Sequence, residues 1–235
     1  MPDFDNPKNL LLRRLSEPIR QSVLACAEYV HVDLRENLIE PDKPILFVDF
    51  PESGVICLLT PMSDGSLVEL ATIGKEGMVG VPVILGAMSV GEVAFCQVAG
   101  ASWRIPTQEF LLLLQQHEEL SLLCRRYAAA LFEQVAINTG CNRTHSMEER
   151  YARWLLLTSD RCDSNDFMLT QEFMAQLLGV SRTGINLVAG MFSKAKLISY
   201  VRGKISILDR EGLEEVCCDC YFAMRSQFDK VINLP

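Results

Sequence analysis

Hydrophobic and polar positions follow two different periods along the 235 residues of this chain. Between residues 7 and 28, apolar residues recur at helical spacing, which predicts a short helix that Pro18 interrupts. From residue 30 to 106 the pattern changes to short β-rich runs separated by turn residues. The predicted strands lie at 45–48, 55–59, 67–73, 93–98 and 102–105. Many short strands with regular turns predict a β sandwich or jelly roll.

Residues 107–145 return to the helical period and join the predicted sheets to the rest of the chain. The small residues Ala128, Ala129 and Ala130 would let a second helix approach closely. A long helix with an apolar seam between two domains indicates a dimerisation element, whereas a helix packed on its own sandwich is the alternative. The dimer contact is predicted at Leu120, Leu123, Tyr127, Ala130, Leu131 and Val135.

After a predicted helix at 147–158 and a polar loop at 159–166, two short helices follow each other closely. Thr170 is a suitable N-cap for the first helix, which stops at Gly179, and Ser181 can cap the second. Two helices joined so tightly have the geometry in which one helix braces the other for insertion into the major groove of DNA. The buried stripe of the second helix is predicted at Ile185, Val188, Ala189 and Phe192.

The chain then forms a predicted hairpin from the runs 197–201 and 205–208, with Arg202, Gly203 and Lys204 at its turn. This wing has a basic tip, which would contact phosphates without reading sequence. Two helices alone could be an ordinary helical hairpin, and a winged module could contact protein, but the wing favours DNA binding. The residues predicted to contact DNA are Thr170, Gln171, Ser181, Arg182, Thr183, Asn186, Lys194, Arg202 and Lys204.

The formal net charge of −8 is unusual for a DNA-binding protein, but the charge is unevenly distributed. Between residues 170 and 208, five basic side chains accompany one acidic side chain, Glu172, so a local basic footprint coincides with the predicted wing and helices. A hydrophobic content of 49% predicts packed cores. Because no run of eighteen apolar residues and no signal peptide occurs, we expect a cytoplasmic protein without a membrane partner.

With sandwich, long helix and winged helix-turn-helix in this order, the chain resembles the Crp/Fnr superfamily of bacterial regulators. The resemblance rests on residues 169–183, on Leu197-Ile198 and the wing ending at Leu208-Asp209, and on 50–54 and 74–80. It implies an α+β fold with a jelly-roll sensor domain at 1–117, a dimerisation helix at 118–145 and a winged helix-turn-helix domain at 146–235.

The resemblance also implies a homodimer joined along 118–145 and bound to a two-fold symmetric operator in double-stranded DNA, with half-sites about one helical turn (~34 Å) apart. An activator of this type would also contact RNA polymerase. Arg182 matches the family's base-reading arginine, whose guanidinium could bond a guanine bidentately. The match then weakens at Thr183, Gly184 and Leu187, so the operator cannot be copied from relatives.

The positions that bind cyclic nucleotides in relatives are occupied by other residue types in this chain. Gly80 is followed by Val81 instead of a carboxylate, and Glu92 and Val93 stand where an arginine and a hydroxyl are required, which argues against cyclic AMP. An iron–sulfur cluster is not expected, because only Cys26 lies in the first fifty residues. No cofactor is therefore identified, and a regulator without a ligand stays an alternative. The effector pocket is predicted at Gly77, Gly80, Val81, Glu92 and Val93.

Cysteine is frequent, with nine residues, and three of them lie within four positions at Cys217, Cys218 and Cys220. These thiols could respond to redox state or to a metal, but they lack the two-residue spacer that suits zinc, and a docked C-terminal helix is the alternative. The three histidines, His31, His117 and His145, are far apart, so no metal site is predicted. A jelly-roll enzyme would need clustered histidines on its strands, so no catalytic residue is predicted.

Overall fold

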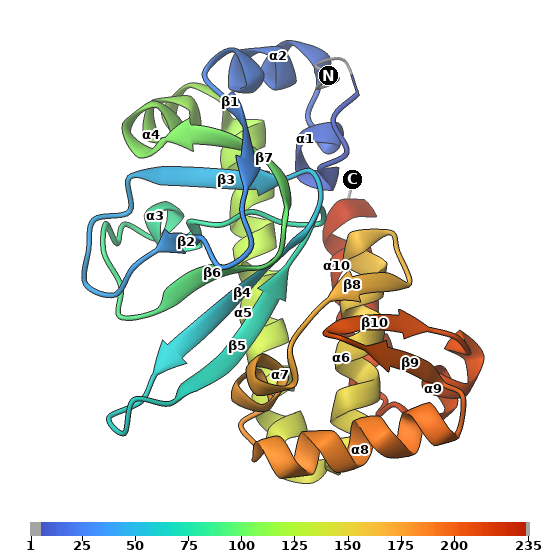
Figure 1. Cartoon of the computed structure of the whole chain (residues 1–235). Helices are drawn as coiled ribbons and strands as arrows, with labels where there is room; N and C mark the ends of the chain where they lie inside the picture. Colours follow the sequence, from blue (N-terminus) through green and yellow to red (C-terminus); the bar gives the residue numbers. More distant parts are fainter. Residues whose placement is uncertain (1–5, 234–235) are drawn as a thin grey trace.

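The computed structural model describes residues 6–233 and shows two packed parts joined by a long helix (Figure 1). The N-terminal part consists of antiparallel strands in two sheets, with strand orders β1-β7-β3 and β2-β6-β4-β5. The strands are β1 (Glu28–Val32), β2 (Asn37–Ile39), β3 (Phe47–Pro51), β4 (Val55–Pro61), β5 (Leu67–Ile73), β6 (Val93–Val98) and β7 (Gly100–Pro106). The predicted two-sheet sandwich is therefore confirmed.

Short helices accompany the strands of this two-sheet N-terminal part, which we call the barrel. Helices α1 (Leu10–Arg14) and α2 (Glu17–Ala25) precede β1, and α3 (Val81–Ile84) separates β5 from β6. The core between the sheets contains large side chains without solvent exposure, such as Trp103 and Phe50. These two residues face each other across the antiparallel pair of β3 and β7, where such cross-strand pairs stabilise the sheet.

Two helices replace the single predicted helical segment, because the backbone of His117 is extended. Helix α4 (Thr107–Gln116) ends there, and α5 (Glu118–Thr144) runs for 27 residues past both sheets into the C-terminal part (Figure 1). The inner face of α5 packs on the barrel core of its own chain. Its buried members are Leu120, Leu123, Cys124, Tyr127, Ala130 and Leu131.

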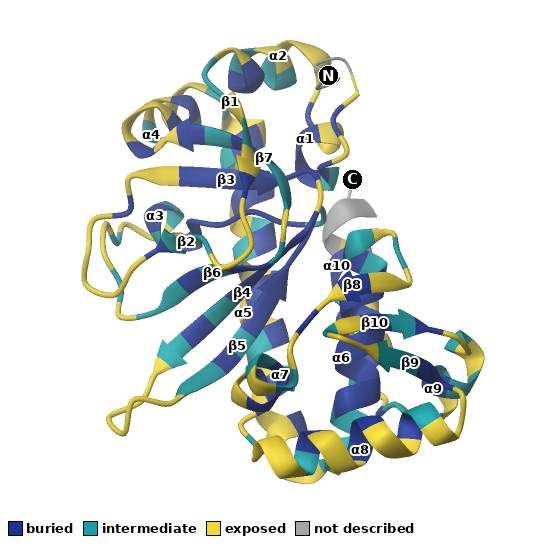
Figure 2. Cartoon of the chain, viewed as in Figure 1, coloured by how far each residue is buried: buried dark blue, intermediate teal, exposed yellow. Residues whose placement is uncertain are grey.

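This packing corrects the predicted dimer contact. Leu120, Leu123, Tyr127, Ala130 and Leu131 are covered within one chain and leave no surface for a partner, and Val135 is half-buried against the same core. The alternative of a helix packed on its own sandwich therefore describes these positions. The opposite face of α5 stays exposed (Figure 2).

The C-terminal part begins with α6 (Met147–Cys162), which a capping box of Ser146 and Glu149 initiates. It continues with α7 (Gln171–Leu177), α8 (Arg182–Lys194), α9 (Arg210–Val216) and α10 (Cys220–Asn233). A three-stranded sheet, in the order β8-β10-β9, consists of β8 (Asp166–Met168), β9 (Ile198–Val201) and β10 (Lys204–Ile207). The predicted hairpin and α+β fold are confirmed. The polar loop predicted at 159–166 is too long, because α6 continues to Cys162 and β8 begins at Asp166.

The two parts share a hydrophobic core. Cys57 and Leu59 of β4 belong to the same buried cluster as Tyr151 and Trp154 of α6. This cluster crosses the predicted boundary between residues 145 and 146, so α6 is fixed on the barrel as well as on the helices that follow it. Among the helices of residues 6–233, none combines the length and apolar character that crossing a membrane requires.

Candidate DNA-binding surface and ligand cavity

Short polar side chains define the ends of α7 and α8. The Thr170 hydroxyl accepts a hydrogen bond from the backbone N–H of Phe173 (3.3 Å), and the Ser181 hydroxyl accepts one from Gly184 (3.1 Å). Between the helices, Gly179 has a φ of +63°, which only glycine adopts at little cost. Both predicted caps are therefore confirmed, and both hydroxyls are engaged within the chain.

One face of α8 is buried on the C-terminal core, as the sequence predicts. Ile185, Val188, Ala189 and Phe192 are all buried, and the Phe192 ring lies 5.4 Å from the ring of Tyr151 on α6. This packing fixes the rotation of α8 about its axis. The opposite face of the helix consequently points away from the protein.

That outer face of α8 lies along the edge of the molecule (Figure 2). Arg182, Thr183, Asn186 and Lys194 are exposed on it, in agreement with their predicted position. Leu187 and Met191 lie on the same face with 64% and 43% of their surface exposed, although they were not predicted as contacts. Their exposure follows from helical spacing, since both positions fall between the predicted polar residues.

The wing turns at Arg202 and Gly203, which have φ values of +51° and +81° and so form the mirror-image turn that suits two-residue hairpins. Arg202 is exposed and forms no ion pair with any residue in 6–233. Lys204, in contrast, pairs with Asp166 of β8 at 3.1 Å. The wing tip is therefore less basic than the sequence indicates.

Helix α7 and the wing tip face the barrel. The Phe173 ring of α7 lies 4.9 Å from the Phe95 ring of β6, and a cavity of about 110 Å³ between the parts is lined by Thr170, Arg202 and Arg35, among others. Gln171 is half-buried beside this contact. The predicted contact residues thus divide into an outward set on α8, from Arg182 to Lys194, and a set near the barrel that includes Thr170, Gln171 and Arg202.

Buried polar contacts fix α6 on the barrel. The Glu69 carboxylate accepts hydrogen bonds from the Trp154 indole (3.1 Å) and the Cys57 thiol (3.6 Å), and burial raises the pKa of Glu69. A second pair joins Arg161 and Glu76 at 2.7 Å, with both side chains largely buried. These contacts make the position of the C-terminal part depend on the barrel.

A cavity of about 390 Å³ lies between the barrel and α5. Gly80, Val81, Glu92 and Val93 line it, as predicted for the effector pocket. Gly77 does not belong to the lining. It lies under α5, where a Cβ atom would come within 2.1 Å of the Tyr127 hydroxyl oxygen.

The rest of the cavity wall is largely aliphatic and includes a strip of α5 that the sequence did not indicate. This strip is formed by Ala128, Leu131, Phe132 and Val135. Among the described residues of the wall, Glu92 is the only charged one. Such a wall suits an apolar, uncharged molecule better than a phosphate, because a buried anion needs cationic or N–H donors.

The structure divides the cysteine cluster. Cys217 donates to the backbone oxygen of Glu214 (3.3 Å), whereas Cys218 lies 3.5 Å from Cys141 of α5 and Cys220 lies 3.7 Å from His145. Among the described residues, His145 thus lies beside cysteines, a neighbourhood that the sequence did not indicate. The hydrogen bond from Cys218 lowers the pKa of Cys141, and the same contact together with burial raises the pKa of Cys218.

Comparisons with known proteins agree with this architecture. Residues 149–216, from α6 to α9, match the family model described as the Crp-like helix-turn-helix domain. A search of curated protein sequences finds no significant match. Many solved structures have a similar fold.

Three of these structures illustrate the similarity. A protein from Eubacterium rectale, described as a regulator of the Crp/Fnr family, has a TM-score of 0.68 at 19% identity, over 88% of this chain and 96% of that chain. FixK2 from Bradyrhizobium japonicum has a TM-score of 0.69 at 13% identity, over 82% and 98%. The regulator CLP from Xanthomonas campestris has a TM-score of 0.63 at 15% identity, over 82% and 99%. At such identities the likeness shows a common fold.

Proposed function

We propose that this chain, a DNA-binding transcription regulator of the Crp/Fnr family, acts as a homodimer on a two-fold symmetric operator. We also propose that an apolar ligand controls its activity. The observation that supports DNA binding is the outward face of α8, which presents polar and apolar side chains while the opposite face is buried. A rigid helix exposed in this way can enter the major groove.

The side chains on this face suit base recognition. Arg182 at the N-terminal end can donate two parallel hydrogen bonds to a guanine, and Asn186, one turn later, can pair with the edge of an adenine. Thr183 and Leu187 offer methyl groups for contact with thymine. Lys194 on the outward face of α8 is placed for a phosphate, whereas Arg202 lies near the barrel and Lys204 already pairs with Asp166, so these two would contribute less.

The dimer would form through the exposed face of α5. We call this face the α5 seam and define it as Leu122, Ala129, Phe132, Ala136 and Gly140. These residues recur at intervals of three, four or seven and therefore line one side of the helix. Phe132 exposes 75% of its surface, which is unusual for a large aromatic side chain in a lone chain. The Crp/Fnr family acts as dimers, so a second copy of this chain is the occupant we propose.

The gating ligand would bind in the cavity between barrel and α5. Its volume of about 390 Å³ suits a small molecule, and the aliphatic wall favours an apolar one. The strip of α5 in this wall would carry the effect of binding to the dimer helix. Cyclic AMP does not suit the site, because Glu92 would face its phosphate.

Selection of bound fragments from random DNA tests the proposal. The purified chain is used at near-physiological salt, together with Arg182→Ala and, as a control, Arg13→Ala, which removes an exposed arginine from α1. We expect a symmetric enriched motif for the wild type and the control, and loss of the motif for Arg182→Ala. A motif that Arg182→Ala retains unchanged would contradict the proposed role of α8.

A further inference from the structure

Four side chains with metal-binding atoms converge where α5 ends. Cys141 lies in the last turn of α5 and His145 caps that helix, whereas Cys218 and Cys220 come from the junction of α9 and α10. One ligand atom from each lies within 4.8 Å of all the others. The pairs are 77 and 75 residues apart in the chain, so only the fold brings them together.

The distances suit a single tetrahedral ion. Zinc binds thiolate sulfur at about 2.3 Å and imidazole nitrogen at about 2.0–2.1 Å, which places two sulfurs about 3.8 Å apart and a sulfur and a nitrogen about 3.5 Å apart. Here Cys141 Sγ and Cys218 Sγ are 3.5 Å apart, and Cys220 Sγ and His145 Nδ1 are 3.7 Å apart. Three sulfurs and one imidazole are a ligand set of structural zinc sites.

The spacing on each element is favourable. Cys141 lies in the last turn of α5, and the backbone N–H of His145, which caps the helix, donates to the carbonyl oxygen of Cys141, so the two residues are neighbours in space. Cys218 and Cys220 flank Asp219 at the start of α10. Two ligands from each of two elements can therefore close a complete tetrahedron.

The surroundings orient and balance these ligands. His145 places Nδ1 towards Cys220 and Nε2 at 3.5 Å from the Asp219 carboxylate, the arrangement in which an outer carboxylate fixes a metal-binding imidazole. Arg153 of α6 is buried nearby, where its charge acts on Cys141 and Cys218. A cation there offsets the negative charge that three thiolates and one divalent ion leave.

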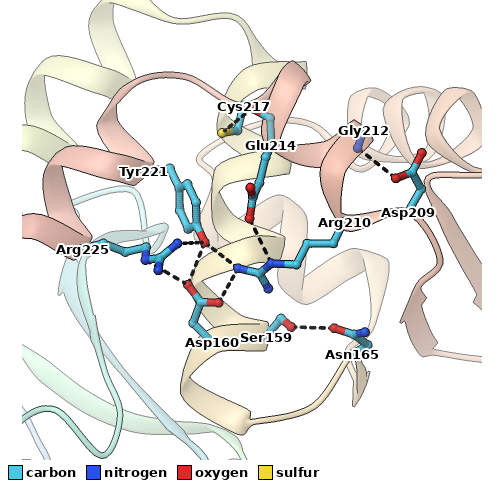
Figure 3. Close-up of polar contacts among 10 residues, drawn as sticks. All are labelled: Ser159, Asp160, Asn165, Asp209, Arg210, Gly212, Glu214, Cys217, Tyr221 and Arg225. Atoms are coloured by element: carbon cyan, nitrogen blue, oxygen red, sulfur yellow. Dashed lines mark hydrogen bonds and ion pairs between the residues drawn. The ribbon is translucent and has the colours of Figure 1, made fainter.

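The junction that carries Cys218 and Cys220 is held from the other side. Arg210 and Tyr221 both bind the Asp160 carboxylate of α6, at 2.6 Å and 2.9 Å (Figure 3). In the same view Cys217 contacts Glu214 within α9. Cys217 is thus a neighbouring cysteine outside the four-residue group and serves as a matched control.

We propose that Cys141, His145, Cys218 and Cys220 bind one zinc-like divalent ion, which ties α10 to the end of α5. His145 and Ser146 form the only chain connection between α5 and α6. An ion at this point would fix the direction in which the DNA-binding part leaves the dimer helix. The site goes beyond the proposed function, and its binding is measured without DNA.

Cobalt titration of the full chain tests the site. The protein is stripped with a chelator under reducing conditions and titrated with Co²⁺, whose tetrahedral thiolate complexes absorb in the near ultraviolet and the visible. We expect about one Co²⁺ per chain for the wild type and for Cys217→Ser, displacement by Zn²⁺, and loss of the bands in Cys218→Ser. In Asp219→Asn the affinity should fall roughly 10-fold or more, because an outer carboxylate is lost.

Asp219→Asn keeps the test valid if Cys218→Ser fails to fold, because Asp219 exposes 90% of its side chain. Equal cobalt bands in Cys217→Ser and Cys218→Ser would overturn the proposal. So would a reduced wild type that binds no Co²⁺ or Zn²⁺. Peptide mapping that finds a Cys141–Cys218 disulfide together with an absence of metal binding would instead assign a redox function to the pair.

Discussion

The indole N–H of Trp154 donates a hydrogen bond of 3.1 Å to the buried carboxylate of Glu69, so α6 of the DNA-binding part and β5 of the barrel share one polar contact. Only 7% of Glu69 is exposed. A buried carboxylate is stable only with such partners, since an unpaired charge in the interior is costly. The contact therefore couples the ionisation of one side chain to the attachment of two parts of the molecule.

Glu69 predicts a pH dependence of stability. Burial raises its pKa above the ordinary value of 4.5, so the folded chain binds the proton more tightly than the unfolded chain does. The stability from this proton is complete below pH 4.5 and is lost as pH rises through the folded pKa. Glu69→Gln removes this dependence while an amide oxygen can still accept from Trp154.

The measurement is denaturant unfolding between pH 5 and 8, followed by tryptophan fluorescence. The free energy of unfolding of the wild type should fall relative to Glu69→Gln as pH increases. Glu215→Gln, which changes an exposed carboxylate on α9, should keep the wild-type profile. Parallel profiles for the wild type and Glu69→Gln would show that Glu69 does not titrate differently on folding.

Arg182→Lys separates base reading from simple charge. Lysine retains the charge but not the planar fork that a bidentate pair needs, so binding to the selected operator should weaken roughly 10- to 100-fold, which corresponds to about 1–3 kcal/mol. Lys194→Ala should weaken binding to all sequences alike and reduce the salt dependence by about one phosphate contact. Fluorescence anisotropy over a series of salt concentrations measures both effects. The same loss for operator and random DNA in Arg182→Lys would assign Arg182 to the backbone.

Phe132→Asp should dissociate the dimer. The side chain is 75% exposed on the α5 seam, and burial of a phenylalanine stabilises by about 1.5–3 kcal/mol. Because a symmetric dimer contains the residue twice, the dissociation constant should rise roughly 100-fold or more. Sedimentation velocity measures this change. Leu112→Asp, at a half-exposed leucine of α4, should leave the dimer intact, and a dimeric Phe132→Asp would place the interface elsewhere.

Gly77→Ala should destabilise the chain. A Cβ atom at this position would lie 2.1 Å from the Tyr127 hydroxyl oxygen, and Tyr127 is fully buried and cannot move aside. The resulting displacement of α5 should cost about 1–3 kcal/mol in the free energy of unfolding. Gly91→Ala, where a Cβ atom meets open space, is the control. Equal unfolding midpoints for the two variants would mean that α5 can shift without lowering the free energy of unfolding.

The sequence predicted the structural features that depend on residues close to one another in the chain. The caps at Thr170 and Ser181, the buried stripe of α8 and the hairpin turn all follow from short spacings, so each could be recognised in place. The faces of α5 could not be assigned, because apolar residues occur on both sides and periodicity does not tell a barrel from a second chain. Strand β8 was not predicted, because a strand of three residues is too short to show an alternating pattern.

The sequence did not predict the candidate metal site, for a related reason. Cys218 and Cys220 are close in sequence, but their partners Cys141 and His145 lie more than seventy residues earlier. Only the antiparallel return of α10 along α5 brings the two pairs together. In the 390 Å³ cavity, similarly, the sequence indicated Gly80, Val81, Glu92 and Val93 but not the rest of the barrel wall, and the wall contributed by α5 depends on where that helix crosses the sheets.

Phe132 belongs both to the α5 seam and to the wall of the 390 Å³ cavity. In the proposed dimer, a molecule bound against one side of this ring would change how the other side contacts a second chain. Thermodynamic linkage then makes the effect reciprocal: whatever factor the ligand adds to subunit affinity, assembly of the pair must add to ligand affinity. The response of such a regulator would therefore vary with its own abundance in the cell as well as with the amount of its effector.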